Sequence, residues 1–176
     1  MTQPDGITPD TKDWTWVLER PCPECGYAAA TMDPLAIGGA IRATLPRWRE
    51  ALGRHDAGAR PSPAVWSPLE YSAHVRDVFR VFDRRLALML TEDDPLFDNW
   101  DQDATALAER YSEQDPATVA AELVVAGEAI AASFDAVTPD QLGRTGRRSD
   151  GASFTIDSFG RYFLHDVVHH LYDVKA

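Results

Sequence analysis

The sequence predicts an all-α protein, an up-down four-helix bundle preceded by an extended N-terminal arm. Three observations predict this fold class. Several long segments carry apolar residues at spacings of three and four, the period of a helix with one buried face. Most of these segments open with Ser, Thr or Asp, often followed by Pro, a combination that starts helices. The 176 residues, 44% of them apolar, suit one domain with a sizeable core.

Residues 1–32 are expected to form the arm and residues 33–176 the bundle. The first twelve residues are polar, with two prolines and one glycine, which is typical of loosely ordered chain ends. The aromatic stretch at residues 13–21 is expected to pack over the bundle as an extended segment.

The chain has two cysteines, both in the sequence CPEC at residues 22–25. Such a pair can be redox-active, half of a zinc site, or incidental. Flanking prolines do not suit a redox motif at a helix start, and the sequence offers no second cysteine pair to complete a zinc site. We therefore predict that Cys22 and Cys25 are structural or incidental, and not essential to the main site.

The first bundle helix is predicted to begin at Asp33, a good N-cap, with Pro34 at its first position. Pro46 lies inside it and should kink it, and Gly53 can end it. The later long helices are expected at residues 67–90, 115–138 and 155–174, with a shorter one at residues 104–111. The second has the clearest start, because Ser67 and Glu70 have the spacing of a capping box.

Histidines on two of these helices predict a metal site inside the bundle. His165 and His169 are four residues apart, which places both side chains on one helical face. His74, in the middle of the second helix, is the candidate third ligand. Three neutral imidazoles suit zinc, nickel or iron. A site with three protein ligands keeps positions open, which is the catalytic pattern.

The helical wheel favours a different pair on the last helix. His170 falls in the same arc as Phe163 and Val167, and Asp166 lies one turn before it. Asp166 and His170 are therefore the alternative ligands, although the last helix is apolar nearly all round and the wheel does not decide. Carboxylates that could support the ligands from outside are Glu70, Asp77 and Asp173.

Two stretches, WSPLEYSAH and HDVVHHLYDV, together carry a resemblance to a known family. A tryptophan, a histidine eight residues later and a distant HxxxH pattern resemble the DinB-like superfamily over residues 33–174. This superfamily includes mycothiol- and bacillithiol-dependent S-transferases and maleylpyruvate isomerases. The resemblance implies a four-helix bundle of the DinB/YfiT-like type with a metal ion held by three histidines. It also favours His165 and His169 over Asp166 and His170.

Two classes of function remain open at this point. The resemblance implies a metal-dependent transferase or isomerase that acts with a low-molecular-weight thiol of the mycothiol type on a small electrophile. A hydrolase that uses an activated water is a variant of the same site. The alternative is a non-catalytic bundle that acts as a dimer or a partner-binding module.

A formal net charge of −11 argues against nonspecific binding to nucleic acid or to an anionic membrane. The short basic cluster RTGRR, at residues 144–148, is expected to be a solvated loop. The sequence contains no run of about 18 apolar residues, and its start is polar and unlike a signal peptide. We therefore expect a cytoplasmic protein, with a homodimer as one assembly to test.

Overall fold

The computed structural model describes residues 6–10 and 12–176, so part of the predicted loose N-terminus lies outside the described residues. The described chain contains five α-helices and a small sheet. The helices are α1 (Ile37–Leu52), α2 (Pro68–Thr91), α3 (Gln102–Ala108), α4 (Pro116–Asp135) and α5 (Ile156–Asp173). Short 3-10 turns at Thr15–Leu18 and Ala29–Thr31 interrupt the N-terminal arm.

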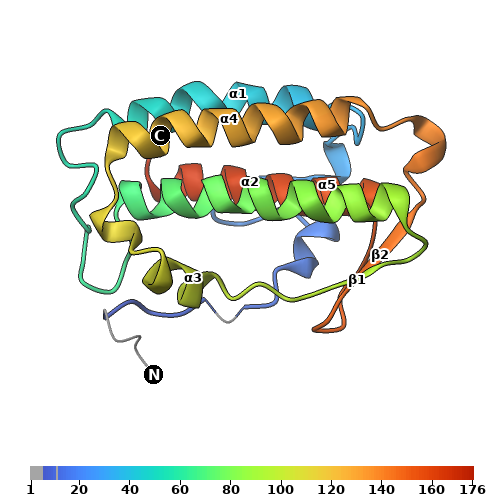
Figure 1. The fold of residues 1–176 in the computed structure, drawn as a ribbon, viewed down its shortest axis with the longest axis horizontal. Coiled ribbons are helices and arrows are strands. Elements are labelled where there is room, and N and C mark those ends of the chain that lie inside the picture. The colour runs from blue at the N-terminus through green and yellow to red at the C-terminus, as the bar shows by residue number, and fades with distance from the viewer. Residues whose placement is uncertain (1–5, 11) are drawn as a thin grey trace.

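The four long helices form two layers, α1 with α4 and α2 with α5 (Figure 1). The predicted up-down order is wrong, because α2 and α4 run in the same direction and α1 and α5 run in the opposite one. The physical reason is the connection at residues 92–115. It returns along the length of the bundle, carrying α3, before α4 begins. A short loop would have made α2 and α4 antiparallel neighbours.

Local start signals place α2, α4 and α5 correctly, whereas the short helix predicted at residues 104–111 lies at Gln102–Ala108 and is capped by Asp101. Ser67 Oγ accepts a hydrogen bond from the Glu70 backbone N–H, and the Glu70 carboxylate accepts one from the Ser67 N–H at 2.8 Å. The Asp115 side chain accepts a hydrogen bond from the Thr118 N–H at the start of α4, and Thr155 forms a capping box at the start of α5. These caps confirm the predicted starts, because capping depends only on residues within one turn.

The first helix begins later than predicted, at Ile37, because Asp33 and the three residues after it form a turn. Asp33 Oδ1 accepts a hydrogen bond from the Leu35 N–H at 2.9 Å, which is a turn within the loop. The helix then continues through Pro46 to Leu52. Pro46 is exposed, so the hydrogen bond that proline cannot donate is lost at the surface of the bundle.

A three-stranded sheet at one end of the bundle corrects the purely all-α prediction. Strand β1 (Leu96–Phe97) pairs in parallel with β2 (Thr145–Arg148), which pairs in an antiparallel manner with β3 (Ser153–Thr155). The sequence reads these segments as polar loops because the strands are short and their partners lie far apart in the chain. The fold remains mostly helical.

The core of the bundle is rich in aromatic side chains. Phe163 of α5 is fully buried, and its ring lies 5.1 Å from that of Phe82 and 5.7 Å from that of Phe134. Among the described residues, α4 alone is long and apolar enough to cross a membrane by length and composition. It packs against α1 and α2, as a core helix of a bundle does.

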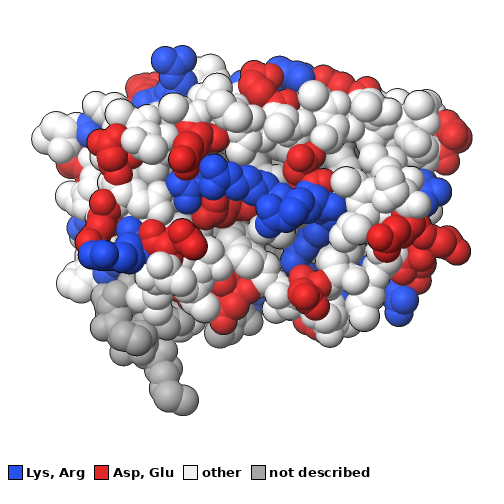
Figure 2. Space-filling view, in the orientation of Figure 1, with Lys and Arg blue, Asp and Glu red and all other residues white. Residues whose placement is uncertain are grey.

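Basic side chains form a band across the face of the molecule that contains α2, with acidic side chains beside it (Figure 2). Arg76 and Arg80 of this helix both pair with Asp77, at 3.0 Å in each case, and with Glu122 of α4. The positive charges of these two arginines are therefore neutralised by carboxylates of the protein itself.

Alanine substitutions at two adjacent glycines at the start of α1 should have opposite effects on the stability of the fold. A Cβ atom at Gly38 would lie 2.6 Å from the backbone oxygen of Ala131, so α1 and α4 would have to separate. A Cβ atom at Gly39 meets nothing within 4 Å. We expect Gly38→Ala to cost about 1–3 kcal/mol of unfolding free energy and Gly39→Ala to add up to about 1 kcal/mol. Denaturant unfolding of both variants measures this, and equal midpoints would contradict the close packing of α1 on α4.

Candidate metal centre

Helix α5 supplies candidate ligands to two separate clusters. His74, Asp166 and His170 each offer one ligand atom, and these atoms lie within 4.8 Å of one another. His165 and His169 lie instead with Cys22 and Cys25, again within 4.8 Å. The structure therefore divides the predicted set of His74, His165 and His169 between two places. It brings His74 together with the alternative pair, and metal binding at either cluster stays a prediction.

The division follows from the geometry of the helix. Neighbouring residues on a helix differ by about 100°, so two pairs offset by one residue face different directions. Helix α5 packs against α1 and α2 and is also covered by the N-terminal arm. Asp166 and His170 lie beside His74 of α2, whereas His165 and His169 lie beside Trp14 of the arm.

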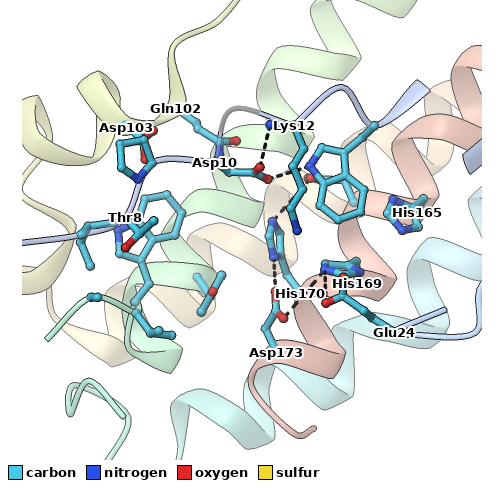
Figure 3. Close-up of a pocket in the computed structure, with 18 of the residues that line it drawn as sticks. Thr8, Asp10, Lys12, Glu24, Gln102, Asp103, His165, His169, His170 and Asp173 are labelled. Carbon is cyan, nitrogen blue, oxygen red and sulfur yellow. Dashed lines mark hydrogen bonds and ion pairs between the residues drawn. The ribbon is translucent and has the colours of Figure 1, made fainter. Parts of the chain in front are cut away.

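The first cluster, which we call the His-Asp-His centre, consists of His74, Asp166 and His170. Nε2 of His74 lies 3.7 Å from one oxygen of Asp166, and Nε2 of His170 lies 3.5 Å from the other. Nδ1 of His170 is 2.8 Å from the Asp173 carboxylate, and Figure 3 draws this contact. The two Nε2 atoms therefore converge on one carboxylate.

Buried polar atoms in this centre fit a bound cation. Both ring nitrogens of His74 and Oδ2 of Asp166 are buried without a hydrogen-bond partner among the described residues. A buried polar atom without a partner costs about 1–3 kcal/mol. A divalent ion would take up such atoms as ligands, and two imidazoles with one carboxylate form a recognised catalytic zinc set. The residues present therefore fit a metal ion.

Neighbouring side chains hold the rings of His74 and His170 in place. The His74 ring stacks on Trp100 with centroids 5.4 Å apart and an interplanar angle of 2°. Trp66, the tryptophan of the sequence motif, covers it at 5.4 Å. The hydrogen bond to Asp173 fixes the ring of His170 and directs Nε2 toward Asp166.

A cavity of about 310 Å³ opens beside the His-Asp-His centre (Figure 3). Trp14, Trp66 and Tyr71 provide aromatic walls, and Asp10, Lys12 and Glu24 of the arm provide charge. A smaller cavity of about 80 Å³ is lined by His74, Arg85, Trp100, Arg148 and Tyr162. Asp166 and Tyr162 line both cavities, so the centre lies between two hollows of the protein.

Comparisons with known proteins agree with this architecture. The sequence pattern of the DinB superfamily matches residues 39–174. The chain belongs to the DinB superfamily. A search of curated proteins finds no match. Among solved structures, the chain is similar to YfiT from Bacillus subtilis, described as a probable metal-dependent hydrolase with an unusual four-helix bundle topology. That match has a TM-score of 0.67 and 18% identity, and it covers 98% of this chain and 94% of that chain.

In this DinB protein, the three side chains of the His-Asp-His centre differ in protonation state. Burial lowers the pKa of His74, which keeps this imidazole neutral and able to bind a metal. Burial also opposes the charge of His170, but Asp166 and Asp173 outweigh it and raise the His170 pKa to about 10. Burial by itself would raise the pKa of the Asp166 carboxyl, but His170 and His74 outweigh this effect and hold that pKa well below the usual range. A metal ion would therefore displace a proton from His170.

Of the three carboxylates predicted to support the ligands of this DinB protein, the structure places Asp173 beside them. Asp173 bonds to His170 and also lies 3.9 Å from Nε2 of His169. Glu70 instead binds Arg60 and caps α2. Asp77 binds Arg76 and accepts a 2.6 Å hydrogen bond from the Tyr111 hydroxyl.

Sequence reasoning missed the place of the two cysteines in this DinB protein. Cys22 Sγ lies 3.6 Å from Nδ1 of His169, although the residues are 147 positions apart. The signal was present, because Cys-x2-Cys together with His-x3-His is the ligand spacing of Cys2His2 zinc sites. A zinc site made of cysteines alone would need a second cysteine pair, but two histidines can take the place of that pair.

Proposed function

We propose that the protein is a divalent-metal-dependent enzyme that transfers a low-molecular-weight thiol to a small electrophilic substrate. The observation that carries metal dependence is the convergence of buried, unpartnered ligand atoms from His74 and Asp166 beside Nε2 of His170. Zinc is the first candidate, because two imidazoles and a carboxylate suit it. A divalent ion held by these residues would supply Lewis acidity and would lower the pKa of a bound thiol or water.

The space around the centre supports a thiol cosubstrate. A wider cavity of about 900 Å³ shares Asp10, Lys12, Trp14, Gln102 and Tyr162 with the cavity beside the centre. An elongated thiol could lie along the arm, with its sulfur near Asp166. Carboxylates and Lys12 can bind its polar groups, and aromatic side chains can cover the electrophile.

Tyr162 is the candidate proton donor. Burial raises the pKa of its hydroxyl, so it keeps its proton at neutral pH. Nη1 of Arg148 donates a hydrogen bond to this hydroxyl at 3.3 Å, which stabilises negative charge on the oxygen. As the thiol sulfur bonds to the electrophilic carbon, the group that takes the bonding electrons can receive the Tyr162 proton.

Hydrolysis is the second candidate, favoured by the carboxylate among the ligands, a donor set that metallohydrolases also use. The structural neighbour YfiT is itself described as a probable metal-dependent hydrolase. The two reactions differ only in the nucleophile, so one experiment separates them. The metal-loaded protein is given electrophiles and esters with and without a panel of thiols, and products are identified by mass spectrometry. Thioether products support transfer, thiol-independent cleavage supports hydrolysis, and no stable metal binding would support a non-catalytic bundle.

Changing Tyr162 to Phe should leave the metal in place and lower turnover by about 10²-fold, the usual contribution of a positioned acid. The ring still packs against Phe154, whose centroid lies 5.1 Å away, so stability should change little. Steady-state kinetics and metal analysis of the same preparation measure both effects. Unchanged turnover would remove Tyr162 from the mechanism.

A further inference from the structure

The second cluster on α5 consists of four side chains that the proposed function does not use. Cys22 and Cys25 come from the N-terminal arm, and His165 and His169 from the helix. One ligand atom of each lies within 4.8 Å of the other three. Cys22, His165 and His169 are all less than a tenth exposed. We call this group the Cys2His2 cluster.

The spacing in the Cys2His2 cluster suits tetrahedral zinc. Zinc–sulfur bonds of about 2.3 Å and zinc–nitrogen bonds of about 2.0–2.1 Å place a sulfur and a nitrogen ligand about 3.6 Å apart. Cys22 Sγ lies 3.6 Å from Nδ1 of His169. The other ligand atoms lie at most 4.8 Å apart, within reach of small side-chain rotations.

The loop that carries the cysteines is folded to present both sulfurs on one side. The Cys22 N–H donates a hydrogen bond to the Tyr27 carbonyl at 2.8 Å, and the Gly26 N–H donates one to the Cys22 carbonyl at 2.9 Å. Gly26 has φ of +75°, a conformation that residues with a side chain rarely adopt. The two thiols are free and form no disulfide, so both can bind a metal.

The histidine side of the cluster is also prepared. Nε2 of His165 is buried without a hydrogen-bond partner among the described residues. Trp14 covers both rings, with centroids 5.3 Å from His165 and 4.9 Å from His169. Nε2 of His169 faces the carboxylates of Glu24 and Asp173, at 4.0 and 3.9 Å. Ligating histidines commonly have such a carboxylate on the other ring nitrogen.

We propose that Cys22, Cys25, His165 and His169 bind a second ion, a structural zinc that fastens the N-terminal arm to α5. This goes beyond the proposed function, whose metal ion is held by the His-Asp-His centre. Four protein ligands close the coordination sphere, the arrangement of structural rather than catalytic zinc. The arm supplies Asp10, Lys12, Trp14 and Glu24 to the cavity, so this ion fixes one wall of it. Asp173 contacts histidines of both clusters and links them.

Metal stoichiometry tests the proposal directly. Protein purified with Zn²⁺ should hold about two equivalents, and Cys22→Ser/Cys25→Ser about one. His74→Ala should also hold about one equivalent of zinc, which in this variant is the ion of the Cys2His2 cluster. Cobalt(II) distinguishes the two losses, because bound thiolates give a charge-transfer absorption. That absorption should disappear in the cysteine variant and persist in His74→Ala. His55→Ala, an exposed loop histidine, is the matched control and should match the parent.

The unaltered protein gives a second measurement that does not depend on the folding of a variant. Zn²⁺ should protect both cysteines from an alkylating reagent, and chelation should expose them, as counted by intact mass. Equal alkylation with and without Zn²⁺, or a cysteine variant that keeps the parent's full metal content, would overturn the proposal. Loss of the His74-dependent ion alone would leave the Cys2His2 site standing and would count against the proposed function instead.

Discussion

His170→Ala should remove the ion from the His-Asp-His centre, whereas the neighbouring change His169→Ala should leave that ion in place. His170 supplies Nε2 toward Asp166 beside His74, and alanine would leave two of the three ligands. His169 points instead at Cys22. We expect His170→Ala to lose catalytic activity and about one equivalent of metal, while its cobalt–thiolate absorption persists.

Two comparisons make this pair of variants decisive. His169→Ala should show the reverse pattern, with cobalt bound by nitrogen and oxygen alone at the His-Asp-His centre. The circular dichroism spectra of both variants should remain those of a helical protein, because α5 keeps its apolar contacts when either histidine is replaced. If His169→Ala loses the ion that lacks thiolate ligands and His170→Ala keeps it, then the three-histidine set implied by the family resemblance is right and the His-Asp-His assignment is wrong.

The metal-free protein should lose stability as the pH rises from about 6.5 to about 10. The His170 pKa is about 10 in the folded protein, because Asp166 and Asp173 outweigh the effect of burial, against about 6.5 in an unfolded chain. A raised histidine pKa stabilises the fold fully below the unfolded value, and this contribution is lost as the pH rises through the folded value. Since one pKa unit corresponds to about 1.4 kcal/mol, the loss should be on the order of a few kcal/mol.

Chelated parent protein and His170→Gln provide the comparison for this pH effect. Glutamine cannot take up the proton, so the difference in unfolding free energy between the two should shrink over the same range. Other alkaline titrations, such as those of the buried tyrosines, act on both proteins alike and cancel. Denaturant unfolding at several pH values measures the difference, and a constant difference would show that His170 holds no extra proton in the folded state.

The sequence alone predicted the features that depend on neighbouring residues. Ser67 and Glu70 form the predicted capping box, and Asp115 and Thr155 cap α4 and α5 through their side chains. Helical spacing likewise placed His165 with His169, and Asp166 with His170, on shared faces of one helix. The family resemblance is confirmed by the match over residues 39–174.

Only the tertiary structure decided which neighbour each of these faces meets. Helix α5 is apolar nearly all round, so the wheel could not tell the side that meets His74 from the side that meets the arm. The crossover at residues 92–115 made α2 and α4 parallel, and long loops paired to form the small sheet. Cys22 reaches His169 across 147 positions of chain. Periodicity describes one helix at a time, whereas ligand sets and helix order depend on contacts between segments that the chain brings together only on folding.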